Sequence, residues 1–146
     1  MTIYSLDTNV IISHLRADRF AEETDQFFRR TIEKEDRLVI PDVVYAELYT
    51  GIYLSENPKS EEKRVQSFLA VNNIEVRASR SLKVAKRAGE LYSTHLNRRG
   101  VAVQRILPDF LIAAQAEATS KAFITWNELD YKDLGLKIPV LSPEKA

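Results

Sequence analysis

The sequence predicts an α/β fold in which a parallel β-sheet carries helices on both faces. Short runs of aliphatic and β-branched residues alternate with longer segments whose apolar residues recur every three or four positions, the patterns of buried strands and amphipathic helices. The five strand-like runs are residues 3–6, 37–40, 74–76, 122–125 and 138–141. With 146 residues, 45% of them hydrophobic, the chain suits one domain with a sizeable core, so we assign residues 1–146 to a single domain.

The composition limits the chemistry that is available. The chain has no cysteine, which excludes disulfides, thiolate nucleophiles and cysteine zinc sites. The two histidines, His14 and His95, do not have the spacing of a ligand pair, so a metal ion would have to be held by oxygen atoms. No apolar run approaches the roughly 20 residues that span a bilayer, and no secretory signal opens the chain. We therefore expect a cytoplasmic protein without a membrane partner.

The charges are balanced overall but unevenly distributed. There are 21 basic and 21 acidic side chains, so net charge gives no argument for nucleic acid. Residues 76–105, however, contain eight basic residues and one acidic residue, a local net charge of +7. Residues 109–133 contain five acidic and two basic residues, a local net charge of −3. A basic segment is thus followed by an acidic one.

The first strand-like run ends in Asp7, and helical spacing begins three residues later. In an open α/β sheet, ligands bind outside the carboxyl ends of the strands, so Asp7 is the first candidate site residue. The alternative is that Asp7, Thr8 or Asn9 caps the helix, because each side chain can accept hydrogen bonds from the first turn. Both interpretations remain open at this point.

The next candidate lies on a helix predicted over residues 43–54. A packing helix over residues 17–35 and the second strand precede it, and Pro41 and Asp42 open it. One broad face carries Val43, Val44, Glu47, Leu48 and Gly51. An ionised carboxylate that faces a core needs a cation, a metal or hydrogen bonds, so Glu47 is either functional or at the margin of that face.

The same helix carries a tyrosine stripe, formed by Tyr45, Tyr49 and Tyr53, on nearly the opposite side. A helix that is apolar almost all round is buried on every side or covered by a partner, and tyrosine suits interfaces because its hydroxyl tolerates water. The tyrosine stripe is therefore either a partner-binding surface or part of the monomer core.

A charged helix, the third strand and a basic helix from Ser79 to Gly100 come next. Arg98, Arg99 and Arg105 lie shortly before the acidic segment, where they could contact phosphate groups of a ligand. The alternative is a solvated helix end whose cations complement the helix dipole.

Asp109 begins a further helix, where its charge is favourable whether or not it has another task. The fourth strand then runs into a polar turn that contains Asn127 and Asp130. The last strand-like run contains Pro139, which would interrupt a central ladder, so we expect it at an edge.

Several acidic side chains are thus expected at one edge of the sheet. Asp7 and the turn at residues 127–130 follow strands, and Asp109 can point to the same edge. Carboxylates held close together repel one another, and in this chain their natural partner is a hard cation such as Mg²⁺ or Mn²⁺. Such cations activate water and stabilise charge on a phosphodiester, so the pattern favours phosphodiester hydrolysis.

Four segments resemble, in order and spacing, the motifs of PIN-domain ribonucleases. They are residues 6–11, 46–48, 109–116 and 125–131, which read LDTNVI, AEL, DFLIAAQA and TWNELDY. The resemblance covers nearly the whole chain and is strongest to the small VapC-type toxins of toxin–antitoxin pairs. It implies a parallel sheet of about five strands and an endoribonuclease that uses Mg²⁺ or Mn²⁺. The implied partners are RNA, a cognate antitoxin and a second copy of the chain in a homodimer.

The resemblance also implies roles for individual residues. Asp7 and Asp109 resemble the principal metal ligands, and Glu47 resembles the acid that supports metal binding or water activation. Asp130 resembles the fourth acid, although many family members have an acid where this chain has Asn127, so either residue could complete the site. The polar residues that orient carboxylates or contact phosphate are matched by Thr8, Asn9, Thr125 and Asn127.

Two other functions remain open, a housekeeping RNA-processing nuclease and a non-catalytic module that binds RNA or protein at the same edge. The sequence has no P-loop, no G-x-G-x-x-G and no G-x-S-x-G, which disfavours nucleotide-binding and serine-hydrolase alternatives. Retention of four acids favours catalysis, and the small size favours the toxin over the processing enzyme.

Overall fold

The computed structural model describes residues 1–78, 81–98 and 105–146, and the strands in these ranges form one sheet. In chain order they are β1 (Ile3–Leu6), β2 (Arg37–Pro41), β3 (Ile74–Arg77), β4 (Ala122–Ile124) and β5 (Val140–Leu141). Every neighbouring pair is parallel, and the order across the sheet is β3-β2-β1-β4-β5. The prediction of a parallel α/β sheet of about five strands is confirmed.

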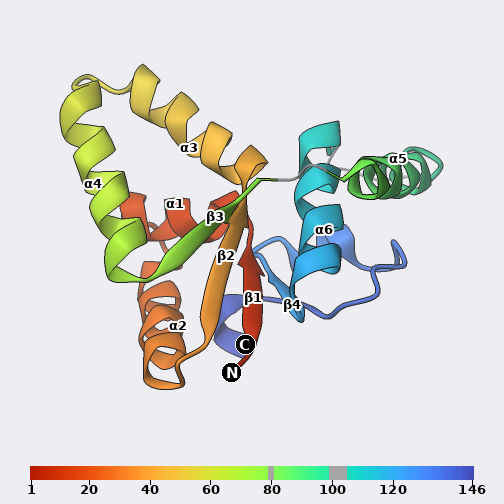
Figure 1. The fold of residues 1–146 in the computed structure, drawn as a ribbon, viewed down its shortest axis with the longest axis horizontal. Coiled ribbons are helices and arrows are strands. Elements are labelled where there is room, and N and C mark those ends of the chain that lie inside the picture. Colours follow the sequence, from red (N-terminus) through yellow and green to blue (C-terminus); the bar gives the residue numbers. More distant parts are fainter. Residues whose placement is uncertain (79–80, 99–104) are drawn as a thin grey trace.

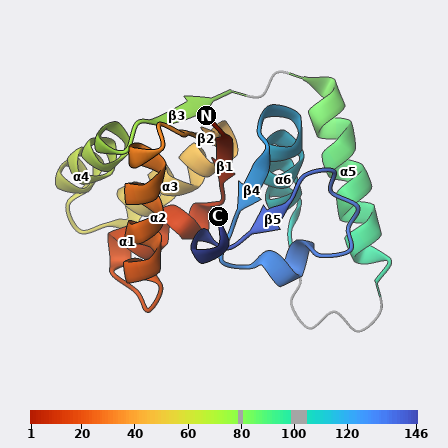
Figure 2. The ribbon, with the colours of Figure 1, turned by 90° about the horizontal axis from the view of Figure 1, so that it is seen from below.

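Helices follow or connect the strands, as the alternating pattern predicted. They are α1 (Thr8–Arg16), α2 (Ala21–Glu33), α3 (Asp42–Leu54), α4 (Pro58–Val71), α5 (Leu82–Leu96) and α6 (Leu107–Thr119). Two short 3₁₀ helices are η1 (Glu128–Tyr131) and η2 (Pro143–Lys145). Figures 1 and 2 show α1 to α4 gathered on one side of the sheet and α5 with α6 on the other. Within the described residues, no helix is long and apolar enough to cross a membrane.

Two predicted helices have different ends. The segment predicted from residue 17 is helical from Ala21, because Ala17 ends α1 in the left-handed conformation (φ 49°) and the carboxylate of Asp18 accepts the N–H of Phe20 (2.9 Å). The basic helix begins after Ser81, whose hydroxyl caps the N–H of Lys83 (3.2 Å), and ends at Leu96. The ends predicted for it, Ser79 and Gly100, lie outside the described residues.

The edge strand β5 begins two residues later than predicted, directly after Pro139. Pro139 has no N–H to give to a ladder, but its carbonyl accepts the N–H of Phe123 in β4 (2.9 Å). The predicted edge position is confirmed, since β5 pairs with β4 and lies at one end of the strand order.

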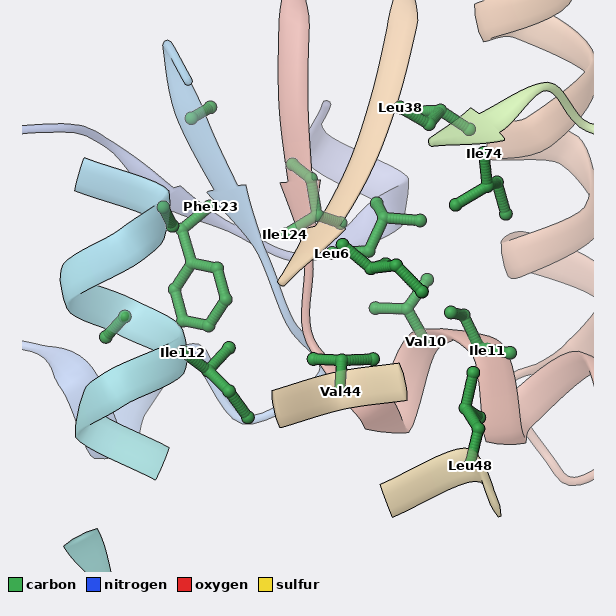
Figure 3. Packing of buried hydrophobic residues seen from close by; sticks show 14 of the residues in the cluster. Leu6, Val10, Ile11, Leu38, Val44, Leu48, Ile74, Ile112, Phe123 and Ile124 are labelled. Carbon is green, nitrogen blue, oxygen red and sulfur yellow. The ribbon is translucent and has the colours of Figure 1, made fainter. Parts of the chain in front are cut away.

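The hydrophobic core packs the sheet against the helices around it. Figure 3 shows Leu6, Val10, Val44, Ile112 and Phe123 converging from β1, α1, α3, α6 and β4, and each is fully buried. The last residues of β1 and β4 belong to this cluster. Because interiors pack densely, the residues that follow these strands begin from fixed positions.

The strand order places a topological switch between β1 and β4. From β1 the chain continues to β2 and β3 on one side, and β4 and β5 lie on the other side. In open α/β sheets, ligands bind at such a switch, outside the carboxyl ends of the strands. The fold therefore directs attention to the residues directly after β1 and β4.

Candidate active site

Asp7 directly follows β1 and caps α1. Its backbone N–H donates to the carbonyl of Ile124 at the end of β4 (2.9 Å). Its Oδ1 accepts the N–H of Thr8 (2.8 Å), and Asp7 takes the N-cap position of the helix. The cap interpretation is therefore correct, and the same carboxylate lies at the switch between β1 and β4.

Two neighbouring side chains orient the second oxygen of Asp7. Oδ2 accepts a hydrogen bond from the hydroxyl of Thr125 (2.8 Å) and a longer one from the amide of Asn9 (3.3 Å). Asn9 Nδ2 also donates to Thr125 Oγ1 (3.0 Å), and its Oδ1 accepts the N–H of Trp126 (3.0 Å). These bonds join the ends of β1 and β4, so the Asp7 carboxylate has one defined orientation.

Burial dominates the electrostatics of Asp7, which is 5% exposed. Loss of solvation raises the pKa of its carboxyl to about 6, although hydrogen bonds from Thr125 and Thr8 act in the opposite direction. The negative charges of Asp109 and Glu47 raise this pKa further. Asp109 and Glu47 therefore lie close enough for their charges to act on Asp7, and a cation beside Asp7 would offset this repulsion.

Glu47 lies on the exposed side of α3, which corrects its predicted position on the core-facing side. The buried residues of α3 are Val44, Leu48 and Ile52. They form one narrow stripe with a four-residue period, and Glu47 and Gly51, one position before two of its members, fall outside it. Thr8 nevertheless connects Glu47 to the site, because its hydroxyl donates to Glu47 Oε1 (2.7 Å).

Asp109 is the third residue of α6 and makes a reciprocal cap with Ile106. Its Oδ2 accepts the N–H of Ile106 (3.1 Å), and its own N–H donates to the Ile106 carbonyl (3.0 Å). Asp109 is partly exposed, whereas Phe110 next to it is fully buried. Asp109 is thus a helix cap whose charge also acts on Asp7.

Asp130 lies in η1 and forms an ion pair with Arg105, whose guanidinium donates to Asp130 Oδ2. The residue expected to contact RNA and the residue expected to complete the acidic set therefore neutralise each other. Asn127, the alternative fourth residue, is exposed. Its N–H donates to Thr125 Oγ1 (3.1 Å) and its carbonyl accepts the N–H of Asp130 (3.0 Å).

The sequence did not predict that Arg105 and Asp130 form an ion pair. The available signal was a basic segment directly before an acidic one. The pairing itself depends on how η1 lies against Arg105, two residues before α6, and no local sequence pattern encodes that placement.

The neighbouring basic candidate, Arg98, lies beside the same turn. Its Nη2 donates to the carbonyl of Lys132 (2.8 Å) and is 4.0 Å from Asp133 Oδ2. Arg99, the third basic candidate, lies outside the described residues.

The tyrosine stripe is partly covered by α4 of the same chain. Gln66 Nε2 donates to the hydroxyls of Tyr45 (2.8 Å) and Tyr49 (3.0 Å), and the Tyr49 hydroxyl donates to Glu62 (2.5 Å). Tyr53, in contrast, is 71% exposed. The monomer therefore supplies part of the cover for this face, and Tyr53 remains available for a partner.

The donor chemistry of this edge suits a hard divalent cation, because it consists of carboxylate, hydroxyl and amide oxygens. Among the described residues, no three acidic or histidine side chains stand close enough together to form a ready-made ligand group. Mg²⁺ commonly keeps several water ligands and binds through one or two carboxylates. The residues present therefore fit an ion that is held partly by water.

Comparison with protein families gives a match to the PIN domain model over residues 4–135. A comparison with curated proteins finds no match.

Solved structures share the fold over nearly the full length. VapBC2 from Rickettsia felis, bound to a promoter DNA fragment, is 24% identical with a TM-score of 0.73, covering 94% of this chain and 96% of that chain. DNA-bound VapBC from Salmonella typhimurium is 22% identical with a TM-score of 0.76, covering 98% and 99%. A toxin–antitoxin complex from Klebsiella pneumoniae is 21% identical with a TM-score of 0.64, covering 96% and 97%.

Proposed function

Because the chain belongs to the PIN domain family, we propose that it is a metal-dependent endoribonuclease that hydrolyses RNA phosphodiester bonds with Mg²⁺ or Mn²⁺. One observation carries the proposal: the buried carboxyl of Asp7 lies at the switch between β1 and β4, where burial raises its pKa and the charges of Asp109 and Glu47 raise it further. A buried carboxyl whose pKa is raised beside other acids is a common feature of functional sites.

In this proposal, Asp7 and Asp109 hold the ion and Glu47 acts on the attacking water. Asp130 is the fourth acid of this edge, where it is paired with Arg105. The bound ion would supply positive charge at the phosphate and lower the pKa of the attacking water. Thr125 and Asn9 keep the Asp7 carboxylate oriented.

In this proposal, Glu47 accepts a proton from the attacking water. The hydroxyl of Thr8 donates a 2.7 Å hydrogen bond to Glu47 Oε1, and the Glu47 side chain is exposed, so water can reach its carboxylate. The oxygen of that water forms a bond to phosphorus as the bond from phosphorus to the 3′ oxygen breaks, and the leaving 3′ oxygen takes up a proton from solvent. The products are a 5′-phosphate and a 3′-hydroxyl.

The basic segment supplies the complementary surface for RNA. Arg98 lies beside the acidic turn, and with Arg99 and Arg105 it would contact backbone phosphates.

We further propose that this nuclease is a cytoplasmic toxin, neutralised by a cognate antitoxin and self-associating as a homodimer. The support is that the solved structures of the same fold include VapBC complexes and a toxin–antitoxin complex, matched over nearly their full length. The tyrosine stripe, through Tyr53, is the proposed partner surface.

The activity is tested by incubating the purified chain with single-stranded RNA in EDTA, in Mg²⁺ and in Mn²⁺. We expect cleavage with either ion, none in EDTA, and a rate about 100-fold lower for Asp109→Asn, equivalent to about 2.7 kcal/mol. Glu56→Gln is the matched control, because Glu56 is an exposed acid between α3 and α4. RNA that is bound but not cut with either ion would instead identify a non-catalytic binding module.

A further inference from the structure

Arg105 stands between two of the candidate acids. Its guanidinium pairs with Asp130, and the next residue, Ile106, donates its N–H to Asp109 (3.1 Å). The Arg105 side chain is only 16% exposed, although it is one of the eight basic residues in the basic segment. A half-buried cation at an edge that is proposed to bind another cation needs an explanation.

The surroundings of Arg105 hold it in place. Its backbone N–H donates to Nε2 of His95, a buried residue of α5 whose ring lies 5.3 Å from that of Phe110 in α6. Its guanidinium carbon lies 5.8 Å from the ring centroid of Tyr131. The backbone of Arg105 is thus bound to α5, and its guanidinium is held against η1 by Asp130 and Tyr131.

The charge is permanent. Burial lowers the pKa of Arg105, but the hydrogen bond to Asp130 and nearby negative groups, including Asp109, outweigh it and raise the pKa overall. Arg105 also retains an unused donor: its Nε is buried and has no hydrogen-bond partner among the described residues. The same is true of the hydroxyl of Tyr131, which is 1% exposed. The unused Nε–H of Arg105 needs an acceptor, and a phosphate oxygen would supply one.

We propose that Arg105 is the internal counter-ion of the acidic edge: it neutralises Asp130, weakens divalent-cation binding by Asp7 and Asp109, and receives an RNA phosphate. This rests on the proposed function. A fixed guanidinium repels a second cation close by, whereas its planar donors suit phosphate oxygens. Asp130 is then the anchor of Arg105 and not a ligand of the ion. The charge of Arg105 therefore lowers the affinity for the metal ion and raises the affinity for RNA.

The test measures two affinities in Arg105→Gln. Mn²⁺ binding to the metal-free protein is followed by titration calorimetry, and binding of a single-stranded RNA oligonucleotide is followed in EDTA. We expect Mn²⁺ to bind about tenfold more tightly and RNA about tenfold more weakly. Arg37→Gln is the matched control. Arg37 is also paired, with its Nη2 2.7 Å from Glu75 Oε2, but it begins β2 and so lies at the amino ends of the strands, away from the acidic edge. This control should change neither affinity.

A double variant, Arg105→Gln with Asp130→Asn, removes the pair without leaving a buried charge unpaired, so it tests the proposal even where the single variant fails to fold. We expect its Mn²⁺ affinity to stay within about threefold of wild type, since both charges are removed together. An affinity that falls more than tenfold would make Asp130 a metal ligand and overturn the proposal.

Other results separate the inference from the proposed function. If wild-type protein binds Mn²⁺ and folded Arg105→Gln binds it no more tightly, or binds RNA as well as wild type, the counter-ion role is wrong while the nuclease proposal stands. If wild-type protein neither binds Mn²⁺ nor cuts RNA, both fail.

Discussion

The charge of Asp7 carries a free-energy cost in the folded protein. Burial holds the pKa of its carboxyl at about 6, above the usual value of 3.8, so the folded state binds a proton more readily than the unfolded state does. Stability from this group is therefore greatest below pH 4 and is lost as the pH rises through 6. Above pH 6, the ionised carboxylate destabilises the metal-free protein.

Asp7→Asn should remove that cost, because asparagine is neutral and caps a helix as well as aspartate does, but its NH2 group cannot accept the hydrogen bonds that Thr125 and Asn9 donate to Asp7 Oδ2. In EDTA we therefore expect the stability of the variant relative to wild type to be higher at pH 8 than at pH 4, by about 1–3 kcal/mol. Thermal unfolding at the two pH values measures this, and cleavage activity should be lost at pH 8. A variant that gains no relative stability at pH 8 and still cuts RNA would show that Asp7 is a structural cap and nothing more.

The buried hydroxyl of Thr125 holds the Asp7 carboxylate in its orientation. It donates to Asp7 and accepts from Asn9 and from the N–H of Asn127. Thr125→Val keeps the shape but leaves these groups without a partner, so we expect a loss of about 1–3 kcal/mol in stability. Cleavage should fall as well, since the Asp7 carboxylate loses its orientation. Thr125→Ser, which restores the hydroxyl, should recover most of both. Equal activity in the valine variant would remove Thr125 from the site.

At the scale of elements, patterns that depend on local sequence predicted most of the structure. The strands were found because buried strands of a parallel sheet are short apolar runs, and the end of β1 was marked by a polar residue that caps α1. The helix ends were less accurate. The helix predicted from residue 17 begins only at Ala21, because Ala17 adopts a left-handed conformation, which alanine seldom does, and no sequence signal marked the turn before α2.

The face of α3 could not be read from its sequence for a different reason. This helix is apolar on two sides, so periodicity could not decide which side meets the core. The answer depends on α4, whose Gln66 and Glu62 bind the hydroxyls of the tyrosine stripe. That contact joins two elements and is absent from either one alone.

Tyr53 is the exposed end of the tyrosine stripe on α3 and the residue proposed to contact a second copy of the chain. Tyr53→Ser should weaken homodimerisation about tenfold, measured by sedimentation equilibrium, because truncating an exposed aromatic anchor removes contact area from the partner. The melting temperature should stay the same, since Tyr53 is 71% exposed in the monomer. Val71→Ser, at a residue 73% exposed on α4, is the control and should change neither quantity. A lower melting temperature with unchanged association would assign Tyr53 to the monomer core.

At the scale of the whole molecule, strand order decides which residues meet. Asp7 and Thr125 are far apart in the sequence, but Thr125 Oγ1 lies 2.8 Å from Asp7 Oδ2 because β1 and β4 are neighbours in the sheet. The sequence predicted this meeting, since a parallel sheet brings the carboxyl ends of its strands to one edge. It did not predict that Arg105 would pair with Asp130, which depends on how the last turns of the chain fold back.

The central claim is that this edge hydrolyses RNA with the help of a divalent ion. End-group analysis of the cleaved RNA, with Mn²⁺ and then with excess EDTA, tests it most directly. We expect fragments with 5′-phosphate and 3′-hydroxyl ends that form with Mn²⁺ and stop forming when EDTA is added. Cleavage that continues in EDTA, or fragments that end in a 2′,3′-cyclic phosphate, would contradict the claim.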